Sequence, residues 1–252
     1  MKWETIVITG ICLTTIINTS CANLSGSASS HKDSTSTDSN EMMNKSQEKA
    51  IQLFDGKTLT GWHAFNKPGK ITNWKIENSA LVCLGAAEGD TGGDIVTDRE
   101  YGNFEFSWDW KIEPGGNSGV MYHVIEAPKY KAPYETGPEY QMIDDEGYPD
   151  KLEDWQKTGA DYAMNLTNEK KKLKPVGEWN SSKIIYNNGH VEHWLNGEKI
   201  VEFQSGDEKW MKQKQEGKWK DYPDYGMAKK GRIALQDHGK KAYFRNIKIK
   251  EL

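Results

Sequence analysis

The sequence predicts an all-β fold, an antiparallel β-sandwich with one short helix. From about residue 50 onward, short runs that alternate apolar and polar residues are separated by Gly, Asn, Asp and Pro, which is typical of antiparallel sheets. The clearest run, 103–113 (NFEFSWDWKIE), places aromatic side chains on one face and polar side chains on the other. With 10 tryptophans and a hydrophobic content of 36%, the chain has enough material for one substantial core.

Turn signals indicate how the strands follow one another. The run at 118–126 comes after a Pro-Gly-Gly-Asn turn at 114–117, so we expect it to form a hairpin with 103–113. Asn-Gly pairs at 188–189 and 196–197 predict the two turns of a three-stranded meander.

The end of the chain predicts two more strands and the short helix. Residues 231–252 read as strands on either side of His238-Gly239, and 207–219 (DEKWMKQKQEGKW) is the best helix candidate. Cys83 is the single cysteine of this region, so it makes no intrachain disulfide, and its apolar neighbours predict a small buried core residue.

The N-terminus predicts targeting and attachment. Residues 1–21 resemble a bacterial lipoprotein signal, because an apolar run at 5–17, too short to be a good membrane span, precedes small residues and Cys21, the expected lipidation site. Residues 22–49 are rich in Ser, Thr, Asn and Asp, which predicts a disordered tether and leaves 50–252 as the β-sandwich domain. We therefore expect a lipid-anchored protein of the bacterial cell envelope, periplasmic or at the surface, with simple secretion or an uncleaved anchor as alternatives.

The charge of the chain excludes some classes of partner. The formal net charge is -4 and the charged residues are scattered, so no basic field indicates nucleic acid or an anionic membrane surface. We expect contact with a membrane only through the lipid anchor.

The strand alternation also predicts a polar face. If the aromatic side of 103–113 faces the core, its partners are Val120, Tyr122, Tyr140, Met142, Ile233 and Leu235. Amides, two histidines and a glutamate then gather on the opposite face, where a surface mixture of Lys and Glu is usual, and this suits an extended polar ligand. Taken singly, each of these residues could be an ordinary solvated position. The predicted face holds Asp109, Lys111, Asn117, His123, Glu139, Gln141, Gln236 and His238.

Six segments in series carry a resemblance to a known family. They are 53–65 (LFDGKTLTGWHAF), 116–123 (GNSGVMYH), 138–147 (PEYQMIDDEG), 174–180 (KPVGEWN), 191–203 (VEHWLNGEKIVEF) and 231–249 (GRIALQDHGKKAYFRNIKI). Together they resemble the 3-keto-disaccharide hydrolase family. The resemblance implies a concanavalin-like jelly roll that cleaves glycosides whose sugar a separate oxidoreductase has first oxidised to a ketone at C3.

The chemistry implied by this resemblance needs a base near C2, donors at the C3 oxygen and an acid at the leaving oxygen. Glu139 and His123 are the candidates for base and acid. His238 or Lys111 could polarise the ketone. Asn117, Gln141 and Gln236 are expected to bind sugar hydroxyls. Asp109 is a further predicted substrate-binding residue.

Other outcomes stay open. No cofactor is certain. The acidic run 144–150 lacks the residue order of a calcium loop, and if a divalent metal binds, we expect His123, Glu139 and Asp144 as its ligands. A conventional glycosidase on the same fold is disfavoured because no strand carries a Glu-x-Asp-x-x-Glu run. A non-catalytic carbohydrate-binding module is the remaining alternative, since the fold alone would suffice for it.

Overall fold

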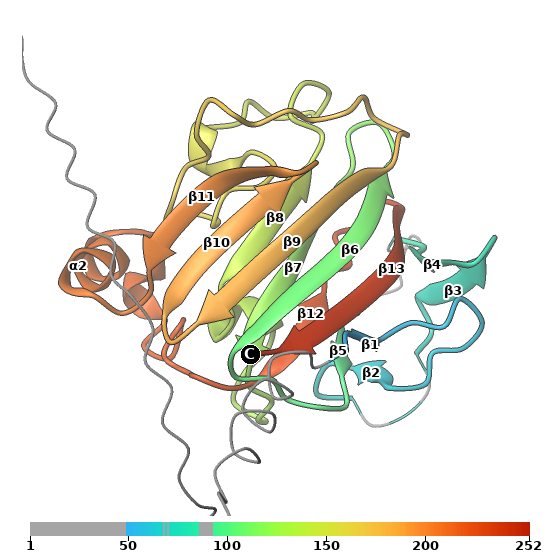
Figure 1. Cartoon of the computed structure of the whole chain (residues 1–252), viewed down its shortest axis with the longest axis horizontal. Coiled ribbons are helices and arrows are strands. Elements are labelled where there is room, and N and C mark those ends of the chain that lie inside the picture. Colours follow the sequence, from blue (N-terminus) through green and yellow to red (C-terminus); the bar gives the residue numbers. More distant parts are fainter. Residues whose placement is uncertain (1–48, 68, 70, 86–92) are drawn as a thin grey trace, which may run out of the picture. The chain divides into compact units, whose positions relative to one another are not determined.

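The computed structural model describes residues 49–67, 69, 71–85 and 93–252, which form a β-sandwich of two antiparallel sheets (Figure 1). The predicted signal at 1–21 and the tether lie outside the described residues, apart from Lys49 at the end of the tether. Within the described part of the chain, no helix is long and apolar enough to cross a membrane.

The larger sheet has eight strands, and its order is β11-β10-β9-β6-β13-β4-β3, with β1 paired to β13. All of its pairings are antiparallel. Its strands are β1 (Ile51–Gln52), β3 (Trp74–Glu77), β4 (Ala80–Cys83), β6 (Phe104–Ile112), β9 (Asn180–Asn187), β10 (His190–Leu195), β11 (Glu198–Gln204) and β13 (Ala242–Glu251).

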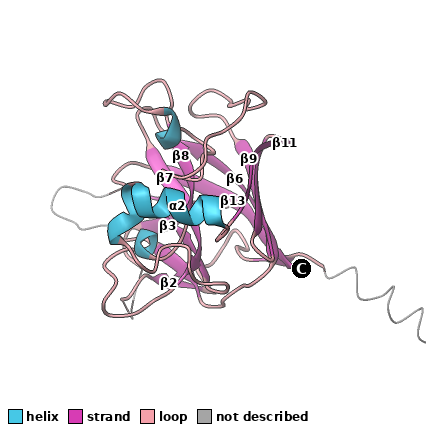
Figure 2. Ribbon diagram, turned by 90° about the vertical axis from the view of Figure 1, so that its left-hand side faces the viewer, coloured by secondary structure: helices cyan, strands magenta, loops and turns pink. Residues whose placement is uncertain are grey.

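The smaller sheet has five strands in the order β2-β5-β12-β7-β8. They are β2 (Trp62–Ala64), β5 (Ile95–Thr97), β7 (Asn117–Val124), β8 (Glu139–Ile143) and β12 (Arg232–Leu235). In the described part of the chain, the helical elements are α2 (Glu208–Glu216) and the short 3-10 turns η1 (Pro133–Glu135), η2 (Asp154–Gln156) and η3 (Lys218–Asp221). Figure 2 shows the two layers, with β7 and β8 in one and β6, β9 and β11 in the other.

The core between the sheets is the predicted aromatic one. Strand β6 alternates buried and half-buried residues along its whole length, because its aromatic side chains face the smaller sheet. The predicted partners of these aromatic side chains are confirmed as members of the same buried cluster. They are Val120, Tyr122, Tyr140, Met142, Ile233 and Leu235. Burial of this much apolar surface is the main stabilisation of the domain.

The predicted meander and helix are confirmed. Strands β9, β10 and β11 pair in succession, and Asn188 and Asn196 adopt the positive φ angles of 50° and 49° that such turns require. Helix α2 begins after Asp207, whose carboxylate accepts a hydrogen bond of 2.7 Å from the Trp210 N–H.

The hairpin predicted for 103–113 and 118–126 is wrong. Strand β6 belongs to the larger sheet and β7 to the smaller one, so the chain crosses between the layers at 113–116. Turn residues indicate that a chain reverses direction, but they do not specify which sheet receives the next strand. Both sheets bury the same kind of alternating strand, so the local pattern fits either position.

Candidate active site

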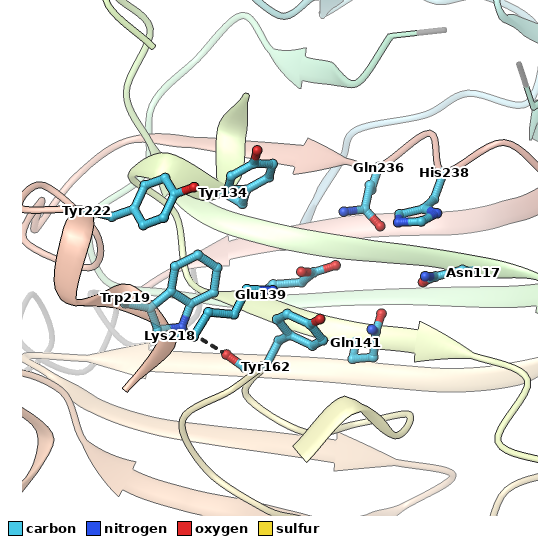
Figure 3. A pocket seen from close by; sticks show the side chains of 10 residues that line it. All are labelled: Asn117, Tyr134, Glu139, Gln141, Tyr162, Lys218, Trp219, Tyr222, Gln236 and His238. Atoms are coloured by element: carbon cyan, nitrogen blue, oxygen red, sulfur yellow. Dashed lines mark hydrogen bonds between the residues drawn. The ribbon is translucent and has the colours of Figure 1, made fainter. Parts of the chain in front are cut away.

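A pocket of about 270 Å³ opens on the outer face of the smaller sheet, away from the sandwich core. Strands β7 and β8 and the residues that follow β12 supply one side of it, and residues around η1, η3 and position 162 supply the other. Ten side chains line it (Figure 3): Asn117, Tyr134, Glu139, Gln141, Tyr162, Lys218, Trp219, Tyr222, Gln236 and His238.

The side made by the sheet, which we call the polar wall, consists of Asn117, Gln141, Gln236 and His238. Strand pairing brings these residues together, since β7 lies between β8 and β12. The Asn117 Oδ1 and Gln236 Oε1 atoms are buried and have no hydrogen-bond partner among the described residues. A buried polar group without a partner costs free energy, so these oxygens are prepared for donors on a ligand.

Glu139 lies between the two sides of the pocket (Figure 3). Its side chain is on β8, is only 4% exposed, and its Oε1 atom has no partner among the described residues. The carboxylate lies directly against Gly119 of β7, at a position where even the Cβ atom of an alanine would collide with it. The missing side chain at Gly119 therefore creates the space that the carboxylate occupies.

The surroundings make Glu139 a strong base. Burial raises its pKa from 4.5 to about 8, and the charges of Asp94 and Asp161 act in the same direction. Lys218 opposes them and lowers the pKa. A carboxyl group whose pKa lies this close to neutrality is suited to proton transfer.

The other side of the pocket is aromatic, and we call Tyr134, Trp219 and Tyr222 the aromatic wall. The Trp219 and Tyr222 rings meet edge to face at 5.6 Å, and those of Tyr134 and Tyr222 at 6.0 Å. The Lys218 ammonium lies over the rings of Tyr162 and Trp219, at 4.1 and 5.2 Å from their centroids. Figure 3 shows Lys218 reaching from the aromatic side of the pocket toward Glu139.

These aromatic residues and Lys218 do not appear among the predicted site residues. The segment that supplies Lys218, Trp219 and Tyr222 follows α2 and carries a helical pattern, which gives no indication that its end folds over a sheet. The one local signal is the close spacing of aromatic and charged residues in 218–225 (KWKDYPDY).

The structure places His123 outside the pocket, although strand alternation predicts it beside Glu139. Against β12, the register of β7 shifts between Met121 and Val124, so that Tyr122 and His123 together oppose Ile233. His123 adopts a φ of 53° and points into the sandwich.

The His123 ring is a buried, neutral part of the core. It packs 4.3 Å from the Tyr186 ring and 5.6 Å from the Phe104 ring, and its Nε2–H donates to the Gly102 carbonyl at 2.9 Å. Burial lowers its pKa to about 4. This position does not support the predicted role of His123 as the acid.

Replacement of His123 should therefore affect stability. We expect His123→Ala to lower the free energy of unfolding by about 2 to 4 kcal/mol, because it leaves a cavity and an unpaired carbonyl at Gly102. His238→Ala, at an exposed position, should change it by less than about 0.5 kcal/mol. Urea unfolding of the two variants measures the difference, and equal effects would contradict this placement of His123.

Asp109 and Lys111 also lie away from the pocket. Both are on β6, and because β6 belongs to the larger sheet, their outer face is the opposite side of the sandwich. Asp109 accepts a hydrogen bond of 2.7 Å from Asn246 there, and the Lys111 ammonium lies 4.7 Å from the Tyr243 ring centroid. This position does not support the predicted substrate contacts of either residue.

The structure does not assemble the predicted metal ligands His123, Glu139 and Asp144. His123 faces the core, and Asp144 lies five residues beyond Glu139, a distance of roughly 16 Å along a strand. The Asp144 carboxylate accepts hydrogen bonds of 2.8 Å from the N–H groups of both Gly115 and Gly147. The start of the acidic run thus stabilises the crossing between the sheets.

A single grouping of metal-ligand type occurs within the described ranges. It consists of His190, Glu192 and Glu202 on the larger sheet. The Lys199 ammonium lies 3.2 Å from the Glu192 carboxylate and 2.7 Å from the Glu202 carboxylate, so both carboxylates already form ion pairs.

A buried carboxyl group of raised pKa, a polar wall and an aromatic wall on a jelly-roll sandwich fit the class of enzymes that act on carbohydrates. Residues 49–250 match the model of a family described as the 3-keto-alpha-glucoside-1,2-lyase-like domain. The chain belongs to this family, whose members act on glycosidic bonds.

Proteins of Bacteroides thetaiotaomicron and Parabacteroides distasonis are similar to this chain. A 3-keto-disaccharide hydrolase of Bacteroides thetaiotaomicron is 32% identical over 226 residues, which cover 80% of this chain and 78% of that protein. A crystal structure of a candidate glycosyl hydrolase from Parabacteroides distasonis ATCC 8503 is 49% identical, with a TM-score of 0.75, over 88% of this chain and all (100%) of that one. A second such structure from the same strain is 28% identical, with a TM-score of 0.63, over 81% and 100% of the two chains.

Proposed function

We propose that this protein cleaves 3-keto-glycosides by elimination, with Glu139 as the base that removes the proton from C2. The observation that carries the proposal is the state of Glu139: one buried carboxylate, without a partner among the described residues, faces a pocket and has a pKa raised to about 8. The name of the Bacteroides relative and the description of the family support a keto-sugar as substrate.

The reaction proceeds in steps that these residues can serve. The C3 ketone makes the C2 hydrogen acidic, and Glu139 takes this proton while an enolate forms between C2 and the C3 oxygen. The enolate then returns its electrons, a double bond forms between C1 and C2, and the C1–O bond breaks with the electron pair on the aglycone oxygen. Water adds at C1 and a proton returns to C2, which gives the free 3-keto sugar.

The lining residues have distinct roles in this proposal. Asn117, Gln141 and Gln236 hold the sugar hydroxyls. His238, on the same wall, polarises the C3 oxygen. Lys218 stabilises the Glu139 carboxylate and donates a proton to the leaving oxygen, the role that the sequence assigns to His123.

A conventional glycosidase mechanism fits the pocket less well. Both retaining and inverting enzymes place two carboxyl groups across the bond, about 5 to 10 Å apart. The ten side chains that line this pocket include one carboxyl, that of Glu139. The nearby buried acid Asp161 already accepts a hydrogen bond of 2.8 Å from Asn165 and does not line the pocket.

The test is nitrophenol release from para-nitrophenyl glucoside and from its 3-keto derivative, measured with the purified protein. We expect release from the keto compound alone, because only the ketone acidifies C2. Release from both compounds would indicate a conventional glycosidase, and binding of either without release would indicate a carbohydrate-binding module.

The proposal extends to the surroundings of the reaction. An oxidoreductase that converts the C3 hydroxyl to a ketone must act first. Attachment to the cell envelope through Cys21 remains a prediction from the sequence.

A further inference from the structure

We propose that the aromatic wall is the subsite for the leaving group, and that the preferred leaving group is itself aromatic. This inference rests on the proposed function, because it orients the same substrate over Glu139. The sugar ring lies on the polar wall and the aglycone lies on Tyr134 and Tyr222, with the almost fully buried Trp219 supporting them from behind.

The two walls differ in what they offer a ligand. Asn117 and Gln236 on the polar wall each present a buried oxygen without a partner among the described residues. The aromatic wall contributes no such buried atom within the same part of the chain. A sugar ring needs hydrogen bonds around its rim, so it gains more on the polar wall, whereas a flat apolar ring gains more against aromatic faces and edges.

Packing and a hydrogen bond hold the Trp219 ring of the aromatic wall in place. Trp219 stacks on Tyr225 with a centroid distance of 4.0 Å and an interplanar angle of 9°, and its Nε1–H donates to the Tyr162 carbonyl at 3.2 Å. Tyr134 lines the pocket and remains 36% exposed, so a ligand can reach it. Rings held in place in advance lose little conformational entropy when a ligand stacks on them.

Two connections fix the segments that carry the wall to one another. The Gly226 N–H donates to the Thr136 carbonyl at 2.8 Å, which links the end of η1 to the chain beyond η3. Asp224 accepts a hydrogen bond of 2.8 Å from the Tyr130 hydroxyl. These bonds hold Tyr134 and Tyr222 next to each other in the aromatic wall.

Lys218 lies where this orientation places the scissile oxygen. Its ammonium is on the border between Glu139 and the aromatic rings. When the C1–O bond breaks, the oxygen keeps the bonding electrons, takes a proton from Lys218, and departs as a phenol along the aromatic wall.

The experiment compares binding of phenyl and methyl 3-keto-glucosides by calorimetry, using Glu139→Gln protein so that neither ligand is consumed. We expect the phenyl compound to bind about tenfold more tightly. Tyr134→Ala and Tyr222→Ala should each reduce this advantage by a factor of about 2 to 12, with less than a twofold change for the methyl compound. Tyr134→Phe and Tyr222→Phe should keep the advantage, and so should Tyr243→Ala on the larger sheet.

Three results would overturn the inference. The first is equal binding of the phenyl and methyl compounds by the Glu139→Gln protein, and the second is an equal loss of affinity for both compounds in the alanine variants. The third is tighter binding of a 3-keto-disaccharide than of the phenyl compound. Because binding is measured without turnover, these results are separate from the fate of the proposed function. The proposed function fails if wild-type protein releases no product from any keto-glycoside, while the binding preference still tests the wall.

Discussion

Glu139→Gln should lower kcat/KM for a 3-keto-glucoside by at least about a hundredfold, within the range of about 10² to 10⁴ that a general base contributes. The amide keeps the shape of the side chain but cannot take the C2 proton. In wild-type protein, kcat/KM should rise about tenfold per pH unit below pH 8 and level off above it, because the pKa of Glu139 is raised to about 8 and the base must be ionised. A profile that instead falls above pH 8 would assign Glu139 as the acid.

The same substitution should stabilise the protein at alkaline pH. Between about pH 4.5 and pH 8, the folded protein keeps a proton on Glu139 that the unfolded chain has lost, because burial raises the pKa. The free energy of unfolding therefore falls as the pH rises through this window, and glutamine does not titrate. Thermal unfolding at pH 6 and pH 9 should show that the advantage of Glu139→Gln over wild type grows with pH.

Glu169→Gln, at an exposed carboxylate, is the matched control for both measurements. It should change neither kcat/KM nor the pH dependence of the melting temperature. If Glu139→Gln also left both quantities unchanged, Glu139 would not be the base, and its ionisation would not lower the stability of the folded protein.

Lys218→Met should lower kcat/KM by about 10² to 10³, the range for removal of one electrostatic contact to developing charge. It should also move the limb of the pH profile upward, because Lys218 lowers the pKa of Glu139. This second effect distinguishes a lost charge from a disturbed pocket, since methionine keeps the length and apolar stem of lysine. Lys218→Arg should return the limb toward its original pH because it restores the charge, and it should restore little of the rate because an arginine does not release its proton.

Lys220→Met provides the control for Lys218→Met. Lys220 is exposed on the same short η3 turn and does not line the pocket. We expect its pH profile and rate to match those of wild type. An unchanged profile in both variants would remove Lys218 from the proposed chemistry.

Much of the fold and part of the site follow from local pattern. Alternation is a property of each strand, so it correctly places Glu139 and Gln141 opposite Tyr140 and Met142. The Asn-Gly turns fix neighbouring strands in the same way. Asn117, Gln236 and His238 reach the pocket with Glu139 because their strands join one sheet.

The remaining site residues depend on information that is not local. The sequence pattern predicts the wrong side of the sandwich for Asp109, because packing across the whole core determines which sheet β6 joins. The sequence pattern predicts the wrong face for His123, because one extra residue in β7 reverses the alternation of side chains from that point of the strand onward. Lys218, Trp219 and Tyr222 come from a segment that packs over the sheet through contacts distant in sequence, and no period in the chain predicts that placement.

The space beside Gly119, which the Glu139 carboxylate fills, decides where that carboxylate can lie. A relative with a larger residue at the position of Gly119 has no room for the glutamate carboxylate where it lies here, although its sheets, its amides and even the glutamate could all be retained. In such a protein the glutamate side chain would have to leave the position that it has here. Glycine at this position is therefore part of what lets the proposed base lie against β7.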